Sequence, residues 1–461
     1  MKTTTTIIDG SYGEGGGQII RNACAYAAIL RKNIKIVNIR AGRTKPGLRA
    51  QHLVGLKLLA AASGASLTNG SCVGSTEILF LAENNTHDNK NNGTNREYVG
   101  DTQTAGSICL LLQAVIPFAL MRGIARNINL KNDESNDGKD ESSLRFILKG
   151  GTDTDFAPPI DYFRYVFLPI FQNSCGSEGT ESCKRKRNEG GEIGKTDIDL
   201  SLIRRGFFPR GGGEVRATIR RPSLKKFPLL PIRLTARGEI VGITIRANAA
   251  GNDPLSMSKK ISTTVKGMIY SNPSYRKVPI RVEHDLLEES SPSTSSGERR
   301  GAKRLRYLSV LIVAETDTGC LLGGSSIGSP KIPLEETARM AAQQVVGAME
   351  GGGCVDDFLQ DQLILYMALA GGVSEIVTNS LTLHTRTAIW LTSRMLPSVR
   401  FQVTKLGVKE DDERGRDGTN LLPPQPPSEN DHIINEDVPG RIPGRHRIRC
   451  YGIGFVPEDQ P

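Results

Sequence analysis

Three glycine triplets recur in this chain and limit how the elements around them can be joined. They occur as EGGGQIIR from Glu14, as PRGGGEVRATI from Pro209 and as EGGGCVDDF from Glu350. Glycine adopts backbone conformations that other residues avoid, so such triplets are typical of tight turns. Three similar turns predict a repeated βαβ-type unit. The prediction needs further support, because the chain holds 50 glycines.

Strand and helix patterns alternate between these turns. Residues Ile34 to Ile39 are β-branched and alternate, as in a strand. Four longer segments carry apolar residues at helical spacing. They are Gln51 to Ala62, Thr104 to Leu120, Pro333 to Met349 and Val355 to Leu369. The alternation predicts an α/β fold, or a layered α+β fold, in which helices cover sheets.

Residues 234–332 have a different pattern and predict a smaller inserted domain. They hold one helical segment and two or three short strands, at Ile240 to Arg246, Val278 to Val282 and Tyr307 to Glu315. We therefore expect a large domain formed by residues 1–233 and 333–461, and a smaller α/β domain formed by residues 234–332.

Several segments are too polar to belong to a packed core. Hydrophobic residues make up 38% of the chain, which is low for a compact globular protein. Segments with few apolar side chains cannot offset the entropy lost on ordering. We expect solvated insertions at residues 84–97, 131–142, 173–197, 286–304 and 408–440.

Charge and cysteine usage narrow the class of protein. The formal net charge of +10 favours polyanionic partners such as RNA, DNA or nucleotides. The eight cysteines are dispersed without a CxxC pair, which argues against a zinc or redox motif and for a cytosolic or nuclear protein. The first residues form no apolar signal sequence, and no apolar run is long enough to cross a membrane, so we expect no membrane partner.

A run of basic residues near the N-terminus is the first candidate for binding phosphates. Between Glu14 and Glu77 the chain has nine Lys or Arg and no acidic residue. Within this run, RAGRTKPGLRAQH places Arg40, Arg43 and other cations around turn-forming glycine and proline. Arginines fixed by such a loop can bind phosphate oxygens with two parallel hydrogen bonds. We favour phosphate binding over a plain solvated loop.

The segment DGSYGEGGGQIIR, residues 9 to 21, is a second candidate. Its glycines let backbone N–H groups approach an anion, and a helix that follows would add its dipole. The carboxylate of Glu14 would repel a phosphate unless a divalent metal ion joined the two. The alternative is a glycine-rich turn that only permits close packing.

His384, in SLTLHTRTAIW, is the candidate nucleophile. We expect Leu381 to Leu383 to end a strand, and Thr385 or Thr387 to cap the helix that follows. The helix dipole there would favour phosphate and a neutral imidazole, and a neutral imidazole is what attack on a phosphate requires. Taken alone, a single histidine more often serves as a cap or a core residue.

Asp361 and Gln362 interrupt an apolar helical run, FLQDQLILYMALA. This polar pair is either the edge of a helix or a site that binds phosphate through a divalent cation or orients a neighbouring group.

Together these stretches resemble the RNA 3′-terminal phosphate cyclase family. The matching segments run in order along nearly the whole chain, with the polar insertions between them. They are GSYGEGGGQIIR, IRAGRTKPGLRAQHL, GSTEI, DTQTAGSICLLLQ, KGGTDTDFAPPIDY, RRGFFPRGGGEV, DDFLQDQLILYMALA and LTLHTRTAIW. The resemblance implies a large domain of repeated βαβαββ-like units with a smaller inserted α/β domain.

The resemblance also implies a ligase-class reaction with ATP as co-substrate. A histidine attacks the α-phosphate of ATP and releases pyrophosphate, and AMP then moves to the 3′-phosphate of RNA. The neighbouring 2′-hydroxyl closes a 2′,3′-cyclic phosphate and expels AMP. A divalent metal, Mg²⁺ or Mn²⁺, is implied as cofactor. The partners implied are ATP and RNA with a 3′-phosphate end.

By motif match, the resemblance assigns roles to particular residues. His384 is the nucleophile, and Glu14 and Asp361 are acidic positions near the triphosphate and the metal. Polar positions that line the nucleotide and phosphate site are Arg21, Arg40, Arg43, Gln51 and His52, with Gln18, Gln103 and Gln362 as further contacts. The stretch with Pro158, Pro159 and Tyr162 resembles a pocket wall or scaffold. Trp390 has no role beyond helix packing.

Two alternative functions would not require this chemistry. One is the branch of cyclase-like proteins in ribosome assembly, which lacks the histidine; the presence of His384 favours the catalytic branch. The other is a plain RNA-binding module, supported by a second basic stretch, residues 201–237, with ten Lys or Arg and only Glu214 as an acid.

The cluster Lys184 to Arg187 is typical of a nuclear import signal or of a solvated loop. We expect the nucleus, with the cytoplasm as the alternative.

Overall fold

The computed structural model describes residues 5–68, 70–82, 97–122, 143–155, 157–175, 198–220, 227–250, 253–286, 307–329, 331–407 and 440–457. The polar insertions predicted at 84–97, 131–142, 173–197, 286–304 and 408–440 fall almost entirely outside these ranges. The cluster Lys184 to Arg187 also lies outside them.

The first unit of the fold pairs its first two strands in parallel and its other strands antiparallel. The sheet order is β1-β2-β4-β3, with α1 and α2 as the connections. Its elements are β1 (Thr6–Asp9), α1 (Gly17–Leu30), β2 (Ile34–Val37), α2 (Ala50–Ser63), β3 (Ser66–Thr68) and β4 (Ile78–Leu81). The chain leaves α2 through Gly64, whose φ of 74° suits a residue without a Cβ.

The second unit repeats this connectivity with the sheet order β5-β6-β8-β7, and β5 and β6 are parallel. Every second side chain of β6 is buried, as expected for a strand with one face on the core. The elements are β5 (Glu97–Asp101), α3 (Ile108–Met121), β6 (Ser143–Gly150), α4 (Ile160–Tyr162), a π-helical turn (Phe163–Phe167), α5 (Leu168–Cys175), β7 (Ile198–Arg204) and β8 (Gly213–Arg220).

The third unit has the same connectivity, but its first strand is separated from the rest by a long insertion. The sheet order is β15-β16-β14-β9, and β9 and β14 are parallel. The elements are β9 (Arg233–Leu234), α8 (Leu359–Leu369), β14 (Val373–Thr378), α9 (Leu383–Met395), β15 (Arg400–Lys405) and β16 (His446–Tyr451). The predicted repeat of βαβαββ-like units is therefore confirmed.

The insertion forms a smaller α/β unit with the sheet order β11-β10-β12-β13. Its elements are β10 (Ile240–Ala250), α6 (Pro254–Ser271), a 3₁₀ turn (Pro273–Tyr275), β11 (Ile280–Leu286), β12 (Tyr307–Thr316), β13 (Leu321–Gly328) and α7 (Leu334–Gly351). Side chains of α6 and α7 share one core with this sheet. That packing argues for moving the expected boundary from residue 332 to the end of α7.

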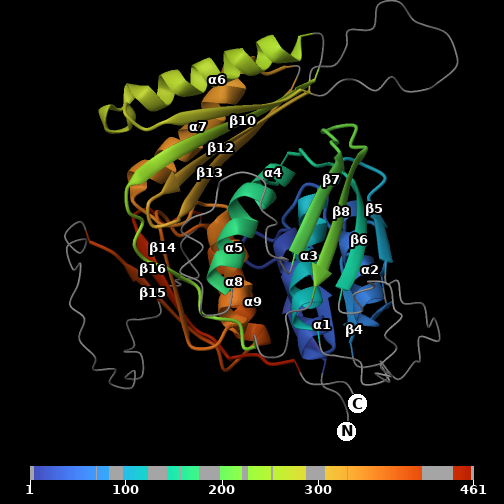
Figure 1. Ribbon diagram of the computed structural model, residues 1–461. Helices are drawn as coiled ribbons and strands as arrows, with labels where there is room; N and C mark the ends of the chain where they lie inside the picture. Colours follow the sequence, from blue (N-terminus) through green and yellow to red (C-terminus); the bar gives the residue numbers. More distant parts are fainter. Residues whose placement is uncertain are drawn as a thin grey trace, which may run out of the picture.

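The helices of the three large units pack against one another, with contacts among α1, α2 and α3, between α1 and α9, and between α8 and α9. Figure 1 shows α5, α8 and α9 between the sheet of β14–β16 and the sheet of β5–β8, with the smaller unit at the top of the view. One continuous hydrophobic core joins the three units.

The glycine triplets do not occupy equivalent places in the repeat, so this part of the prediction was wrong. The first leads into α1, the second lies in the turn between β7 and β8, and the third ends α7. The repeat comes instead from the pattern of strands and helices. The predicted strand at 34–39 and the four predicted helices are present; two of the helices, α3 and α8, begin four residues later than expected, at Ile108 and Leu359.

Candidate active site

His384 lies in the first turn of α9 with a half-exposed side chain. The helix begins earlier than predicted: Thr382, not Thr385 or Thr387, is the cap, and its hydroxyl accepts the N–H of Thr385 at 3.2 Å. Leu381 belongs to no strand and forms only an isolated bridge to Ile442. His384 is therefore held at a helix N-terminus, where unpaired N–H groups favour anions.

The N-terminal ends of α1, α8 and α9 lie close together around His384. Nδ1 of His384 lies 2.8 Å from Oε2 of Glu14, just before α1, and 3.4 Å from Oε1 of Gln18 in the first turn of α1. Gln18 is almost completely buried, and its Nε2 donates to Oδ2 of Asp361, in the first turn of α8, at 2.6 Å. Residues far apart in the chain thus form one polar cluster: Glu14, Gln18, Asp361 and His384.

The charged groups around His384 shift its pKa in the direction opposite to the one expected from the helix dipole. Burial alone lowers the pKa of His384, but the contact with Glu14 and the charge of Asp361 outweigh it, so the pKa of His384 is raised above its ordinary value of 6.5. Burial disfavours ionised Glu14, but His384 and Arg43 prevail and lower the pKa of Glu14 to about 2. The contacts with Glu14 and Asp361 thus favour the protonated ring, opposite to the effect expected from the helix dipole. The neutral ring that attack on a phosphate requires stays a prediction.

Asp361 behaves differently from Glu14. Burial raises the pKa of Asp361 to about 6, although the charges of His384 and Arg21 favour its ionised form. The two carboxylates therefore have pKa values on opposite sides of their ordinary range. Such separation is typical of sites in which titratable groups take different roles.

Two of the predicted arginines join the cluster. The guanidinium of Arg43 forms an ion pair with Glu14 and also donates to its backbone oxygen at 3.1 Å. Arg21 donates to Oε1 of Gln113 at 3.1 Å, and its Nε is buried without a hydrogen-bond partner. Burial lowers the pKa of Arg21 to about 10, so it stays charged at neutral pH. A buried cation with an unused donor suits an anionic ligand.

Arg40 and His52 shape the basic loop. Arg40 has a φ of 54°, and its Nη1 donates to the backbone oxygens of Lys45 and Gly47 at 2.9 Å each, so it closes the loop. Nδ1 of His52 accepts the N–H of Arg49 at 3.1 Å and so caps α2. Burial and the charges of neighbouring arginines lower the pKa of His52 to about 3, so its ring is neutral.

Three predicted residues make their contacts elsewhere. Oε1 of Gln51 accepts the N–H of Ser107 at 3.0 Å, at the start of α3. Gln103 is exposed, has a φ of 52°, and donates its N–H to Asp101 at 2.8 Å. Nε2 of Gln362 donates to the backbone oxygen of Phe358 at 2.6 Å. No direct contact between these three and His384 occurs in the described ranges.

A small cavity lies beside Asp361 and Gln18. Its volume is about 20 Å³, room for about one water molecule. Gln362 also lines it, and the Oε1 of Gln362 is buried without a hydrogen-bond partner. The predicted pair Asp361 and Gln362 therefore lines a small cavity whose walls also include Gln18, Phe163 and Phe167.

Sequence reasoning missed Gln360, which contacts the turn that carries His384. Gln360 is fully buried, and its Oε1 accepts the hydroxyl of Thr385 at 2.8 Å and the N–H of Thr382 at 3.3 Å. Both partners belong to the start of α9, so α8 fixes the turn that carries His384. The signal available was a third polar residue in LQDQL, next to the pair already noted.

Trp390 also has a role that the sequence did not reveal. Its ring stacks on Tyr12 with centroids 3.8 Å apart and planes inclined by 10°. Tyr12 belongs to the glycine-rich loop, and a Cβ added at Gly13 would lie 2.3 Å from the hydroxyl of Thr387. The loop therefore lies directly on α9, which brings Glu14 to His384.

Asp356 joins three parts of the fold just before α8. Its carboxylate accepts the hydroxyl of Tyr162 at 2.5 Å, the N–H of Gly323 at 2.7 Å, and the N–H groups of Phe358 and Leu359 at 2.9 Å each. Tyr162 is thus a buried part of the scaffold rather than a ligand contact.

Glu14 and Asp361 were predicted to bind a divalent metal. In the part of the chain that the structure describes, no group of three or more His, Cys, Asp or Glu is placed to hold a metal ion. In nucleotide sites, Mg²⁺ is commonly held by one or two carboxylates together with phosphates and water. The two acids fit this second arrangement, because both adjoin His384 and Arg21.

Among the helices within the described ranges, none combines the length and the apolar character needed to span a lipid bilayer.

Comparison with known proteins agrees with this geometry. The family model described as RNA 3′-terminal phosphate cyclase matches residues 12–403. A protein of Dictyostelium discoideum named as a probable RNA 3′-terminal phosphate cyclase is 34% identical over 417 residues, covering 90% of this chain and 81% of its own length. RNA 3′-terminal phosphate cyclases of Staphylothermus marinus and Drosophila melanogaster are 32% and 33% identical, each covering 86% of this chain and 93% and 92% of their own lengths. The chain therefore belongs to the RNA 3′-terminal phosphate cyclase family, a family of enzymes.

Proposed function

We propose that this chain converts the 3′-terminal phosphate of RNA to a 2′,3′-cyclic phosphate, with ATP as co-substrate and a covalent histidine-AMP intermediate. Family membership supports RNA and ATP as substrates. The observation that carries the covalent step is the contact of His384 with Glu14 at a helix N-terminus.

In the first step, Nε2 of His384 attacks the α-phosphorus of ATP. Nδ1 is turned toward Glu14 and Gln18, so Nε2 is the nitrogen left for the phosphorus. The N–P bond forms as the bond from phosphorus to pyrophosphate breaks. The ring becomes positive, and the carboxylate of Glu14 stabilises that charge and keeps the proton on Nδ1, as a carboxylate does for the histidine of a catalytic triad.

In the second step, an oxygen of the RNA 3′-phosphate attacks the phosphorus of AMP, and the N–P bond to His384 breaks. In the third step, the 2′-hydroxyl attacks the 3′-phosphorus, loses its proton, and AMP leaves. Adenylation is needed because the unmodified monoester lacks a good leaving group. The 2′-hydroxyl restricts the last step to RNA.

The charged groups around His384 fit the needs of phosphoryl transfer. The phosphates of ATP bring negative charge next to two cations, Arg21 and Arg43, and to the N-termini of α1 and α9. A divalent cation, Mg²⁺ or Mn²⁺, bound through Glu14 and Asp361 would offset further charge on the triphosphate.

The nucleus is the compartment that we propose, with the cytoplasm as the alternative. The cluster Lys184 to Arg187 supports it, and this cluster lies outside the described residues. A fluorescent fusion with these four residues changed to alanine would stay out of the nucleus if the cluster is the import signal.

The test of the proposed function is transfer of label from α-labelled ATP to the protein. The full chain is incubated with α-labelled ATP and Mg²⁺ or Mn²⁺, and then with RNA that ends in a 3′-phosphate. We expect an acid-labile labelled band that is absent in His384→Ala, and RNA ends that become resistant to phosphatase. A folded protein that takes up no label under varied metal and pH would instead favour the non-catalytic cyclase-like branch or an RNA-binding role.

A further inference from the structure

The second basic stretch, residues 201–237, has no part in the chemistry above. Its centre is the turn between β7 and β8, with the sequence RRGFFPRGGG. Four side chains of this segment are exposed: Arg204, Phe208, Pro209 and Arg210, and Phe208 has 49% of its surface accessible. A single exposed apolar residue has no meaning by itself, so the structure around it decides its role.

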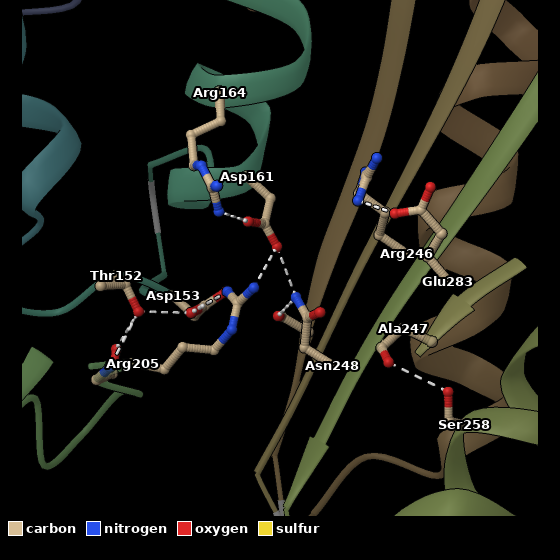
Figure 2. A network of polar contacts seen from close by, with 12 residues as sticks. Thr152, Asp153, Asp161, Arg164, Arg205, Arg246, Ala247, Asn248, Ser258 and Glu283 are labelled. Atoms are coloured by element: carbon tan, nitrogen blue, oxygen red, sulfur yellow. Dashed lines mark hydrogen bonds and ion pairs between the residues drawn. The ribbon is translucent and has the colours of Figure 1, made fainter. Parts of the chain in front are cut away.

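The base of the turn is fixed by buried charges. Arg205, whose side chain is 5% exposed, lies between two buried carboxylates, 3.4 Å from Asp153 and 2.8 Å from Asp161. Figure 2 shows the guanidinium of Arg205 between these acids, with Asn248 of β10 reaching Asp161 from the smaller unit. Removing charges from water is costly, so such a cluster persists only where the geometry is well defined.

The backbone of the turn is held at several points as well. Gly206 donates its N–H to the hydroxyl of Thr152 at 2.9 Å, and Phe208 donates its N–H to the backbone oxygen of Asp153 at 3.0 Å. The ring of Phe207 points inward and stacks on Tyr307 of β12, with centroids 5.3 Å apart. The two neighbouring phenylalanines thus differ: Phe207 anchors the turn and Phe208 is presented to solvent on a rigid support.

The turn contacts the segment that leads into α3. A Cβ added at Gly211 would lie 2.6 Å from the backbone oxygen of Thr104, in the segment that leads into α3. Ser107, at the end of that segment, donates its N–H to Gln51 in the first turn of α2. The next residue, His52, lies against Gly17 at the start of α1. A continuous series of contacts therefore runs from Phe208 to the helix that carries Gln18.

The charge around Phe208 favours a polyanion. Arg204 and Arg210 are exposed and stand before and after Phe208 in the sequence of the turn, and Nε of Arg204 donates to the backbone oxygen of Gly212 at 2.7 Å. The acid opposite Arg204 in the sheet register, Glu214, accepts a hydrogen bond from Arg216 at 3.2 Å. An exposed aromatic ring between arginines is the arrangement by which proteins bind single-stranded nucleic acid, with bases on the ring and phosphates on the guanidinium groups.

We propose that Phe208 is a stacking platform for a base of the RNA strand that leads to the 3′-phosphate, and that Arg204 and Arg210 bind the phosphates of that strand. This rests on the proposed function, because it takes the substrate to be RNA that enters the site of His384. The platform acts on nucleotides upstream of the reacting end. It therefore affects the affinity for long RNA, and it does not affect the covalent reaction of the protein with ATP.

The experiment compares two RNAs by fluorescence anisotropy: a dinucleotide with a 3′-phosphate and a single strand of roughly 16 nucleotides, the upper range of site sizes for single-strand binders. The variants are Phe208→Ala, Phe208→Leu and Phe208→Tyr. Val241→Ala is the control, because Val241 is 47% exposed on β10 of the smaller unit. Label transfer from ATP is measured for each protein without RNA.

Phe208→Ala and Phe208→Leu are expected to bind the long RNA about 5- to 100-fold more weakly, the range for loss of one base–aromatic stack. Phe208→Tyr and Val241→Ala are expected to bind like the natural protein, and all variants to bind the dinucleotide and to take up label normally. Unchanged binding of long RNA by Phe208→Ala would overturn the proposal, and so would full binding by Phe208→Leu or equal weakening of the dinucleotide. Anisotropy measures RNA binding and needs no catalysis. A protein that never takes up label would therefore refute the proposed function, and the binding of long RNA by the Phe208 variants would still test the platform.

Discussion

Oε2 of Glu14 lies 2.8 Å from Nδ1 of His384, although the two residues come from opposite ends of the chain. The glycine-rich loop was expected to bind phosphate through its backbone, and Glu14 seemed out of place there without a metal. The contact supplies a second reason for an acid in this loop. The carboxylate lies against the ring of His384 and favours its positive form, so in the proposed function the loop and the nucleophile would work as one unit.

The pH dependence of label transfer tests this relationship. The pKa of His384 is raised because Glu14 and Asp361 favour its protonated form. A protonated ring cannot attack, so the rate is expected to rise with pH through a midpoint above 6.5. In Glu14→Gln one of these carboxylates is gone, the pKa of His384 falls, and the midpoint moves to lower pH. Single-turnover rates across pH, each scaled to its own plateau, measure the midpoint.

A matched control for Glu14 is available on the surface. Glu77 pairs with Lys35 at 2.9 Å, and both side chains are well exposed. Glu77→Gln removes the same charge without touching the cluster and should leave the pH profile unchanged. A midpoint that stays fixed or moves upward in Glu14→Gln would mean that Glu14 does not control the ionisation of His384.

Gln360→Leu is expected to weaken both the fold and label transfer. The change leaves the hydroxyl of Thr385 and the N–H of Thr382 without their acceptor, which costs about 1–3 kcal/mol per buried group. The turn before His384 then loses its tie to α8, and the rate of label transfer falls. Urea unfolding and single-turnover kinetics measure the two effects.

The control for Gln360 lies in the smaller unit. Oε1 of Gln344, an exposed residue of α7, accepts the N–H of Ser325 at 3.0 Å, so Gln344→Leu removes one hydrogen bond of the same type at a less buried position. It should lower stability with little effect on label transfer. If both variants slow label transfer equally at matched stability, Gln360 has no specific part in placing His384.

Trp390→Ala is expected to release the glycine-rich loop from α9. The stacked pair of Trp390 and Tyr12 contributes about 0.5–1.5 kcal/mol beyond the area that it buries. Loss of the stack lets Glu14 move away from His384, so the pH midpoint of label transfer should fall, as in Glu14→Gln. Trp390→Phe keeps a stacked ring and should retain the original midpoint. If the pH profile of Trp390→Ala is identical to that of the natural protein, the stack of Trp390 on Tyr12 does not hold Glu14 against His384.

Asp356→Ala is expected to be among the more destabilising single changes, because it leaves four donors without an acceptor, including the hydroxyl of Tyr162. Each buried donor left without a partner costs about 1–3 kcal/mol. Tyr162→Phe removes only one of the four bonds and should cost about 1 kcal/mol. Equilibrium unfolding in urea gives both values, and equal costs for the two variants would contradict the shared role of Asp356.

The elements predicted from periodicity are present because their pattern is local. Ile34 to Val37 and the helix from Ala50 to Ser63 follow alternation and helical spacing that a short window of sequence contains. Helix starts were less predictable: α3 and α8 begin four residues later than expected, and α9 begins before the threonines expected to cap it. A cap depends on which side chain turns back onto the backbone, and spacing does not encode that choice.

Only some of the residues predicted for the candidate site lie together in the structure, for a similar reason. Glu14, Gln18, Arg21, Arg43, Asp361 and His384 were chosen from motifs and from the family resemblance, and they do form one cluster. Arg40 instead closes its own loop, and Gln51, Gln103 and Gln362 make their contacts elsewhere. The contacts of Gln360 with Thr385, of Trp390 with Tyr12 and of Asp356 with Tyr162 were missed because each partner lies on another element.

The sequence by itself determined the order of strands and helices, the presence of an inserted unit, and the residue types available for phosphate chemistry, because these follow from local periodicity, composition and motifs. Only the tertiary structure decided which of those residues meet, in which direction their contacts shift the pKa of His384, and which of two adjacent phenylalanines, Phe207 or Phe208, is exposed. The physical reason is that pKa values, burial and contact distances depend on groups brought together from distant parts of the chain.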